Sequence, residues 1–316
     1  MRKKTLGHYY ILLRRKIIRP ILKNERLSYF LSKHCVKTFL SMFYENWVGR
    51  MLNFSHPEDV NQLLMRLSID AYEDPAQHSL RVRCADKYLV REYVASKGLD
   101  DILIPSYGAY GNFDEIDFDK LPNRFVIQTN FGCGQIWICK DKKAADLTVW
   151  RKQFDDWMAI EDFGWKTGEW QYNEIPHKLV VTKYLDGLGS TPVIDYKFHC
   201  FNGSIYGCLV VYDRVLSGVH SMQLDHYNSE WNRTDSIIES YHPKRRQIDK
   251  PNCYEQMIEI AKSLSKDFPY CRVDLYEVEG KVYFGELTFT PQGNVMSYYT
   301  GEALADMLHY YQSTQI

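Results

Sequence analysis

The sequence lacks a long hydrophobic run, which argues against a protein built around membrane-spanning helices. No stretch approaches the ~20 apolar residues that a helix needs to cross a bilayer. The apolar segment at 9–13 is followed at once by Arg14, Arg15 and Lys16, so it is too short for the core of a secretory signal peptide. We therefore expect neither a membrane span nor a cleaved leader.

Closely spaced cysteine pairs are also missing. The sequence has no CxxC motif and no histidine at the spacing of a zinc ligand, which disfavours both a structural zinc site and a disulfide framework. We expect reduced thiols and a cytoplasmic protein. The eight cysteines are Cys35, Cys84, Cys133, Cys139, Cys200, Cys208, Cys253 and Cys271.

Strong compositional bias is absent as well. Apolar residues make up 45% and charged residues 25% of the chain, the mixture of an ordinary globular protein. This composition disfavours a disordered chain, a collagen-like repeat or a coiled coil. At the usual ~150 residues per domain, the 316 residues have room for about two domains.

The net charge of −1 conceals two regions of opposite sign. Residues 1–40 hold eleven Lys or Arg and one acid, Glu25, a balance of +10. The other 276 residues hold 28 basic and 39 acidic groups, a balance of −11. We expect the two parts to face different partners. The acidic part carries no recognition motif for nucleic acid, so we expect no such partner.

Residues 1–82 have the apolar spacing of helices and form a basic N-terminal region. Within residues 1–26 this pattern allows two interpretations. The segment could rest on the anionic inner face of the cytoplasmic membrane, near a lipid-linked glycan. It could equally be a solvated helix face whose basic stems cover apolar surface. The side chains concerned are Arg14, Arg15, Lys16, Arg19 and Lys23, with Tyr9, Tyr10, Ile17, Ile18 and Leu22.

Residues 83–183 change to short strands and turns, and we expect them to form one subdomain. A helix that ends at Gly98 opens this segment, and a stretch at 150–170 is predicted to be helical. The predicted strands lie at 125–130, 136–140 and 178–185.

Residues 184–316 have the alternation of an antiparallel sheet and form the second predicted subdomain. Asn202-Gly203 and Glu279-Gly280 are the expected turns of two hairpins. A helix at 253–266 is predicted between them.

The last hairpin carries two carboxylates at opposed positions. Asp274, on the same face as Arg272, is expected to lie across the ladder from Glu286. Glu286 is expected to share its face with Thr288 and Phe284. Opposed carboxylates repel unless a cation or proton lies between them, and paired hard oxygens suit Mg²⁺ that carries a nucleotide triphosphate. The alternative is a solvated face with ordinary surface acids.

Two further segments have the residue types of a nucleotide site. Gly132 and Gly134 stand between two strands, where backbone amides could cradle phosphate, although GxG is often only a tight turn. Asp195 and Lys197 share a strand face and could meet a ribose and a phosphate, or could belong to a cross-strand ion pair. The strand edge at 183–185 offers backbone to an adenine.

The order of these segments resembles the ATP-grasp fold, and specifically the TupA-like ATP-grasp family, which is linked to teichuronopeptide and other bacterial surface-polysaccharide synthesis. The most specific similarity lies in ADKYLVREYV at 85–94 and RVDLYEVEGKVYFGELTFTPQG at 272–293. The second of these is also distantly similar to the end of D-alanyl-D-alanine ligases. The resemblance implies an α+β protein in which two α/β subdomains clasp ATP, preceded by the helical N-terminal region.

The resemblance also implies roles for individual residues. Mg²⁺ would be held by Asp274, Glu286 and Thr288. Charge on the transferred phosphoryl group would be met by Arg272, Lys197 and Arg214. The nucleotide would contact Lys87, Gln128, Gly132, Gly134, Lys183, Leu185 and Asp195.

Three positions depart from the ATP-grasp pattern. Gln128 stands where such enzymes carry a lysine, Thr182 replaces an acid at the adenine hinge, and Thr288 replaces the asparagine that completes the metal site. The favoured function is a ligase that forms an amide through an acylphosphate. It would join an amino acid to a uronic-acid-containing surface polysaccharide such as capsule or O-antigen. A glycan kinase and a non-catalytic scaffold are the alternatives.

Aromatic residues make up 15% of the chain. Most aromatic side chains in proteins belong to cores, but some stack on sugars. The candidates in polar, loop-like settings are Trp165, Trp170, Tyr172 and Trp231.

Overall fold

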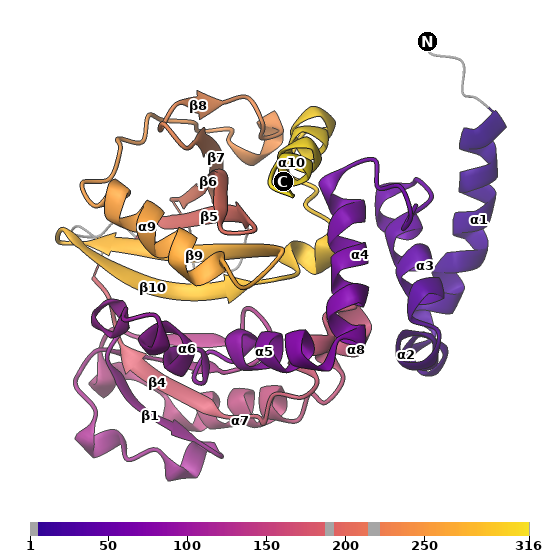
Figure 1. Cartoon of the computed structure of the whole chain (residues 1–316). Helices are drawn as coiled ribbons and strands as arrows, with labels where there is room; N and C mark the ends of the chain where they lie inside the picture. Colours follow the sequence, from indigo (N-terminus) through magenta and orange to yellow (C-terminus); the bar gives the residue numbers. More distant parts are fainter. Residues whose placement is uncertain (1–5, 187–192, 214–221, 316) are drawn as a thin grey trace.

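The computed structural model describes residues 6–186, 193–213 and 222–315, in which a group of N-terminal helices stands beside two antiparallel sheets (Figure 1). Side-chain caps set two of the helix starts: Asn24 accepts from the Leu27 N–H at 3.1 Å, and Asp59 accepts from the Gln62 N–H at 3.0 Å. The helices before the first strand are α1 (Leu6–Lys23), α2 (Glu25–His34), α3 (Val36–Val48), α4 (Val60–Glu73), α5 (Pro75–Ala85) and α6 (Val90–Ser96).

The first sheet is antiparallel throughout and contains the glycine turn. Its strands run in the order β1 (Ser106–Tyr110), β4 (Leu179–Lys183), β2 (Phe125–Thr129) and β3 (Ile136–Cys139). The three predicted strands are confirmed, whereas β1, with the sequence SYGAY, is not indicated by the pattern because it lacks an apolar alternation. The helix α7 (Leu147–Met158) packs on this sheet through Trp150 and Phe154. A shorter helix, α8 (Phe163–Thr167), follows it.

The second sheet holds both predicted hairpins. Its antiparallel strands run in the order β10 (Lys281–Thr288), β9 (Tyr270–Val278), β5 (Asp195–Phe201), β6 (Ser204–Tyr212), β7 (Gln223–Asn228) and β8 (Arg233–Thr234). The turns at Asn202-Gly203 and Glu279-Gly280 are confirmed, and all four residues have positive φ. The pattern does not indicate β7, because its buried Asp225 is polar; Tyr212 satisfies that carboxylate with a hydrogen bond of 2.9 Å.

Helices pack on both faces of the second sheet. The predicted helix near 253–266 is α9 (Tyr254–Ser265), which shares a core with α6 on the face of Phe198 and Val273. The other face, near Phe201 and Tyr270, packs against α4 and α10 (Gly301–Ser313). Although α4 lies within the predicted N-terminal region, it therefore contributes to the core of this sheet.

The helices α2 and α3 pack with α4 and with the segment after α8 in a smaller core. Phe39 and Leu40 of α3 pack with Met65 of α4 and with Trp170, which follows α8 in the chain. In Figure 1 these helices stand to one side of α4, away from the strands. The basic N-terminal region is thus attached to the segment that leads into β4.

Two absences predicted from the sequence can be compared with the structure. All eight cysteines are free thiols, even Cys200 and Cys271, which are direct cross-strand partners. Within the described ranges, no helix combines the length and the apolar content that crossing a membrane requires.

Candidate active site

The predicted carboxylate pair lies on the hairpin of β9 and β10. Asp274 is the direct cross-strand partner of Glu286, as predicted. The expectation that Glu286 shares a face with Phe284 is wrong, because the register shifts by one residue between these positions. Phe284 packs into the core with Leu275, and Glu286 lies on the opposite face. The intervening residue is Gly285, where an added Cβ would lie 2.9 Å from the carbonyl oxygen of Asp274.

Two cations neutralise the buried carboxylate of Asp274. Arg272 donates from Nε to Oδ1 and from Nη2 to Oδ2, each at 2.7 Å, and Lys197 of β5 donates to Oδ2. Burial alone would raise the pKa of Asp274, but the two cations outweigh it and lower the pKa to about 2. Lys197 also lies 3.5 Å from Asp195, so the predicted pair on β5 is part of a larger cross-strand ion cluster.

The cation between the two opposed carboxylates is Arg272 itself. Its Nη2 donates to Glu286 Oε1 at 3.2 Å and to the Thr288 hydroxyl at 3.0 Å, and that hydroxyl donates to Glu286 Oε1 at 3.2 Å. Asp274 is fully buried, whereas the side chain of Glu286 is 41% exposed. Glu286 is therefore the carboxylate of this cluster that a ligand can reach. The alternative of ordinary, solvated surface acids is wrong for Asp274.

The structure brings the three predicted magnesium ligands, Asp274, Glu286 and Thr288, together around Arg272, which donates to each of these side chains. Mg²⁺ takes hard oxygen ligands and is usually held by one or two carboxylates together with substrate phosphates. In the part of the chain that the structure describes, no group of three or more His, Cys, Asp or Glu side chains could hold a metal ion. The role of these three residues as magnesium ligands stays a prediction.

The glycine turn lies against Lys87. The Lys87 ammonium donates to the Gly132 carbonyl oxygen at 2.7 Å. Its own backbone N–H donates to the Asn130 carbonyl oxygen at 3.0 Å, and the Asn130 amide donates to Asp86 at 2.8 Å, so the position is fixed on both sides. Burial lowers the pKa of Lys87, and the Glu286 carboxylate is the strongest influence against that shift. The turn and the hairpin acids therefore act on each other electrostatically.

The other predicted nucleotide contacts lie on or beside the first sheet. Gln128 is half-buried on β2, Lys183 is exposed at the end of β4, and Leu185 is half-buried just beyond it. Gly134 is exposed in the left-handed conformation with φ 76°. Among the described residues, no hydrogen bond or ion pair joins these side chains to the ion cluster. Arg214 lies outside the described residues, and its role stays a prediction.

Glu169 is a buried acid beside this site that the sequence pattern does not indicate. The hydroxyl of Thr290, just after β10, donates to its Oε1 at 2.6 Å, and the Gln171 amide donates to that hydroxyl at 2.8 Å. Burial raises the pKa of Glu169 to about 7; Glu286 adds to this shift and Lys87 opposes it. No local motif marks Glu169, because its partner stands 121 positions away in the chain.

A profile of the TupA-like ATP-grasp family matches residues 66–308. That range covers more than half of the chain and includes both sheets, the glycine turn and the ion cluster. The chain belongs to the TupA-like ATP-grasp family. Its fold is therefore the ATP-grasp fold, as the sequence resemblance implies.

Solved structures similar to this TupA-like protein include ligases. The D-alanine–D-alanine ligase from Bacillus anthracis has 18% identity over 72% of this chain and 63% of that chain, with a TM-score of 0.42. The L-amino acid ligase from Bacillus licheniformis has 11% identity over 72% of this chain and 47% of that one, with a TM-score of 0.45.

The predicted likeness to D-alanyl-D-alanine ligases recurs in the enzyme from Helicobacter pylori, at 15% identity over 82% of this chain and 67% of that chain, with a TM-score of 0.43. The chain spans less than two thirds of the length of the Bacillus anthracis ligase. TM-scores of this size say nothing about the activity of the TupA-like protein. No curated protein matches it.

Two of the aromatic side chains predicted to suit sugar stacking belong to the core. Trp170 is 2% and Trp231 9% exposed, so neither ring offers a face to a ligand. Trp165 and Tyr172 are half-buried. The polar neighbours do not reveal this burial: Glu169 and Gln171 beside Trp170 are themselves buried, and Glu230 and Asn232 beside Trp231 are exposed.

The helix α1 divides the residues predicted to face a membrane into two groups. Ile18 is buried, and Arg14 donates to Glu45 of α3 at 2.9 and 3.1 Å, so these side chains face the protein. Tyr10 and Ile17 are 56% and 63% exposed. Lys16, Arg19 and Lys23 are exposed as well, so the contact of α1 with a membrane stays a prediction.

Proposed function

We propose that the TupA-like protein is an ATP-dependent carboxylate–amine ligase. The observation that carries this proposal is the ion cluster across β5, β9 and β10, with the glycine turn and Lys87 beside it. Its substrates would be ATP, an amino acid and a uronic-acid-containing surface polysaccharide or its precursor, in keeping with the family resemblance. The protein would then work in the cytoplasm.

The proposed reaction has two steps. A carboxylate oxygen of one substrate attacks the γ-phosphorus of ATP in line, the bond to the leaving ADP oxygen breaks, and an acylphosphate forms. The amine of the second substrate attacks the acyl carbon, phosphate leaves, and the nitrogen loses a proton as the amide forms. A bound Mg²⁺ would offset charge on the phosphates. Glu169, with a pKa of about 7, can hold or release a proton near neutral pH.

Most of what this chain would contribute is positioning and positive charge. Lys87 and the amides of the glycine turn are suited to hold phosphate oxygens. Arg272 has five N–H donors and Lys197 three, so both can meet phosphoryl oxygens while they keep a bond to Asp274. Gln128 stands where the ATP-grasp pattern has a lysine, and Lys87 would supply the positive charge at the glycine turn in its place.

A specific observation favours one alternative, the non-catalytic scaffold. Asp274 is already neutralised by Arg272 and Lys197, so the cluster is stable without a metal ion. A scaffold would bind no Mg-ATP. A glycan kinase would use the same residues and differ only in its product, a phosphorylated sugar.

One incubation separates these functions. The full chain is supplied with Mg-ATP and pooled amino acids, with and without uronic-acid oligosaccharides, and ADP, phosphate and product masses are followed. A new amide mass with phosphate release is the expected result. A phosphosugar would identify a kinase, and the absence of both turnover and Mg-ATP binding would identify a scaffold.

The matched variants are Glu286→Gln and Glu279→Gln. Glu286 is partly exposed, so its substitution tests the metal site with little effect on folding. Glu279 is an exposed acid at the turn of the same hairpin. We expect Glu286→Gln to lower turnover about 100-fold, the size of effect seen when a catalytic electrostatic contact is removed, and Glu279→Gln to leave it unchanged. Equal turnover in the two variants would disprove the site assignment.

We also propose that the outer face of α1 contacts an anionic membrane. Tyr10, Leu13 and Ile17 stand at helical spacing, and each is more than half exposed. Leu13→Glu/Ile17→Glu should lower co-sedimentation with phosphatidylglycerol vesicles. The control, Leu147→Glu/Val149→Glu, alters two exposed apolar residues of α7. Binding that survives the α1 change would overturn this proposal.

A further inference from the structure

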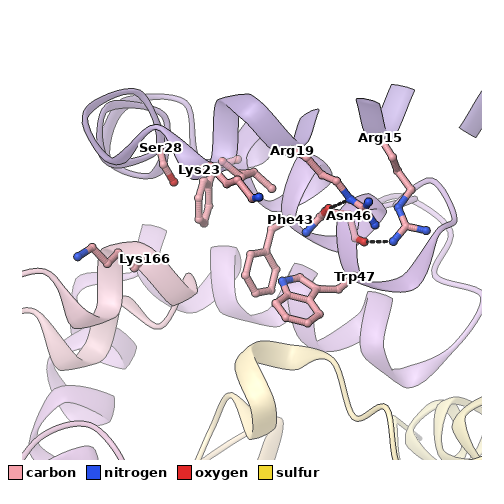
Figure 2. Close-up of a pocket in the computed structure, with 10 residues that line it drawn as sticks. Arg15, Arg19, Lys23, Ser28, Phe43, Asn46, Trp47 and Lys166 are labelled. Atoms are coloured by element: carbon pink, nitrogen blue, oxygen red, sulfur yellow. Dashed lines mark hydrogen bonds between the residues drawn. The ribbon is translucent and has the colours of Figure 1, made fainter. Parts of the chain in front are cut away.

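A basic pocket of about 550 Å³ lies where α1, α2 and α3 approach α8. Its cations are Arg15, Arg19 and Lys23 from α1 and Lys166 from α8; in Figure 2 the three α1 cations lie above and to one side of Phe43 and Lys166 lies on the other side. This pocket is built largely from the basic N-terminal region, and the ion cluster on the second sheet contributes no residue to it.

Three of these cations have no carboxylate partner. In the described part of the chain, no ion pair involves Arg15, Arg19 or Lys23. Arg15 donates to the Asn46 carbonyl oxygen at 2.6 Å and Arg19 to the Asn46 side chain at 3.3 Å, so both guanidinium groups are held by neutral acceptors. The Nε of Arg15 is buried with no hydrogen-bond partner.

The neighbouring Arg14 makes the contrast clear. It is paired with the Glu45 carboxylate at 2.9 Å, and the pocket's Lys166 is paired with Asp162 at 2.9 Å. The three α1 cations of the pocket have no such partner among the described residues. Like charges that are gathered in one place repel one another unless a counter-charge joins them. The composition of the pocket therefore calls for an anionic ligand.

Aromatic rings form one wall of the same pocket. The rings of Phe43 and Trp47 are 6.2 Å apart, and Trp47 is 66% exposed. An exposed indole beside guanidinium groups offers a flat apolar face next to positive charge. A sugar ring that bears a carboxylate or phosphate matches both features.

The pocket borders the segment that follows β10. The Phe43 ring is 3.5 Å from where a Cβ on Gly293 would lie, and Gly293 follows the end of β10. On α8, Phe163 lies 3.4 Å from where a Cβ on Gly132 would lie. A second cavity, of about 790 Å³, runs along α8 and shares Lys166 with the first. A chain of sugars could therefore extend from the pocket towards the glycine turn.

We propose that this pocket binds an anionic sugar unit of the acceptor substrate, with its acid on the α1 cations and its ring on Trp47. The proposal rests on the proposed ligase function, since it names a subsite for the glycan. The N-terminal helices would then be part of the substrate site.

The test is calorimetric titration of the full chain, without ATP, with tri-galacturonic acid, glucose 1-phosphate and neutral maltotriose. We expect the two acidic sugars to bind and maltotriose to bind at least about tenfold more weakly, because loss of the charge contacts should remove about 1.4 kcal/mol. Binding of the carboxylate sugar alone or the phosphate sugar alone identifies which acid the pocket takes.

The pocket variant is Arg15→Gln/Arg19→Gln/Lys23→Gln, and its matched control is Lys16→Gln/Arg26→Gln/Lys33→Gln. The pocket variant removes three cations of α1, and the control removes one cation of α1 and two of α2 that do not line the pocket. We expect the pocket variant to bind the acidic sugars about tenfold more weakly and the control to bind them as the wild type does. Lys23→Glu serves as a second variant in case the triple variant disturbs the packing of α1, because it removes none of the hydrogen bonds of the described residues. It should also weaken the binding of acidic sugars.

Equal sugar binding by the two triple variants, or no acidic-sugar binding by the wild type, would overturn the proposal. Loss of phosphatidylglycerol-vesicle binding in the pocket variant with unchanged sugar binding would also overturn it and assign these cations to a membrane. Because no titration contains ATP, this result is separate from the amide-product assay. A protein that binds acidic sugars in the pocket but makes no amide would disprove the ligase and leave the subsite standing.

Discussion

The two groups of cations in this protein differ in what balances their charge. On the second sheet, Arg272 and Lys197 meet the carboxylate of Asp274, which is fully buried. In the α1 pocket, Arg15 and Arg19 are held by neutral oxygens of one asparagine. The first group is needed by the fold, because a lone buried carboxylate is very costly. The second group is not, so its charge remains available to a ligand.

The largest test of this difference is Asp274→Asn. The substitution removes the buried counter-charge that Arg272 and Lys197 share and leaves them the longer contacts to Glu286 and Asp195, at 3.2 and 3.5 Å. We therefore expect the free energy of unfolding to fall by about 3–5 kcal/mol. Urea unfolding measures it. Glu286→Gln, at the exposed edge of the same cluster, should cost less than about 1 kcal/mol. Similar costs for the two variants would show that the cluster does not depend on the buried carboxylate.

Glu169→Gln tests a buried acid of the site that has no ion pair among the described residues. Its pKa is about 7 in the folded protein and ordinary in the unfolded chain, so between about pH 4.5 and 7 the folded state binds the extra proton. Stability therefore falls as pH rises through this window, by up to about 3 kcal/mol. The glutamine variant should lack this decline. Urea unfolding at pH 5 and pH 8 measures the decline. If the wild type and the glutamine variant lost the same free energy of unfolding between these pH values, the buried-carboxyl assignment would be refuted.

Gly285→Ala tests how Glu286 reaches the cluster. An added Cβ would lie 2.9 Å from both the Asp274 carbonyl oxygen and the Tyr276 ring, so we expect a loss of about 1–3 kcal/mol and weaker Mg-ATP binding. Gly301→Ala is the control, because a Cβ there meets nothing within 4 Å. If the two alanine variants had the same free energy of unfolding and the same affinity for Mg-ATP, the register shift at Gly285 would not be needed to place Glu286.

The smallest effect on stability is expected for Trp47→Ala. Because this ring is 66% exposed, removing it should change the free energy of unfolding by less than about 0.5 kcal/mol. Trp170→Ala, in the core beneath, should cost about 3–5 kcal/mol. If Trp47→Ala cost more than about 2 kcal/mol, Trp47 would be part of the fold, and the contrast between the pocket and the sheet would fail.

The sequence predicts the hairpins well because their determinants are local. Asn202-Gly203 and Glu279-Gly280 fix each turn, and the turn fixes which residues pair, so the opposition of Asp274 and Glu286 follows. The one-residue shift at Gly285 does not follow, because it depends on a close approach between strands.

The rest of the site depends on distant contacts. Glu169 becomes a site residue only where Thr290 meets it, and the α1 pocket exists only because α1 and α3 pack side by side. The basic charge of residues 1–40 is visible in the sequence, but its division into paired and unpaired cations is not. That division depends on which arginine of α1 bonds to Glu45 and which bond to Asn46.

The hydrogen bond from Lys87 to Gly132 bears on how fast and how tightly the proposed site would bind a nucleotide. An ammonium group has three N–H donors, and this bond uses one of them. The turn and its cation are therefore assembled when the chain folds, and the entropy of ordering them is lost then, not on binding. Under the proposed function, an incoming phosphate would therefore meet a turn and an ammonium group that are already in place.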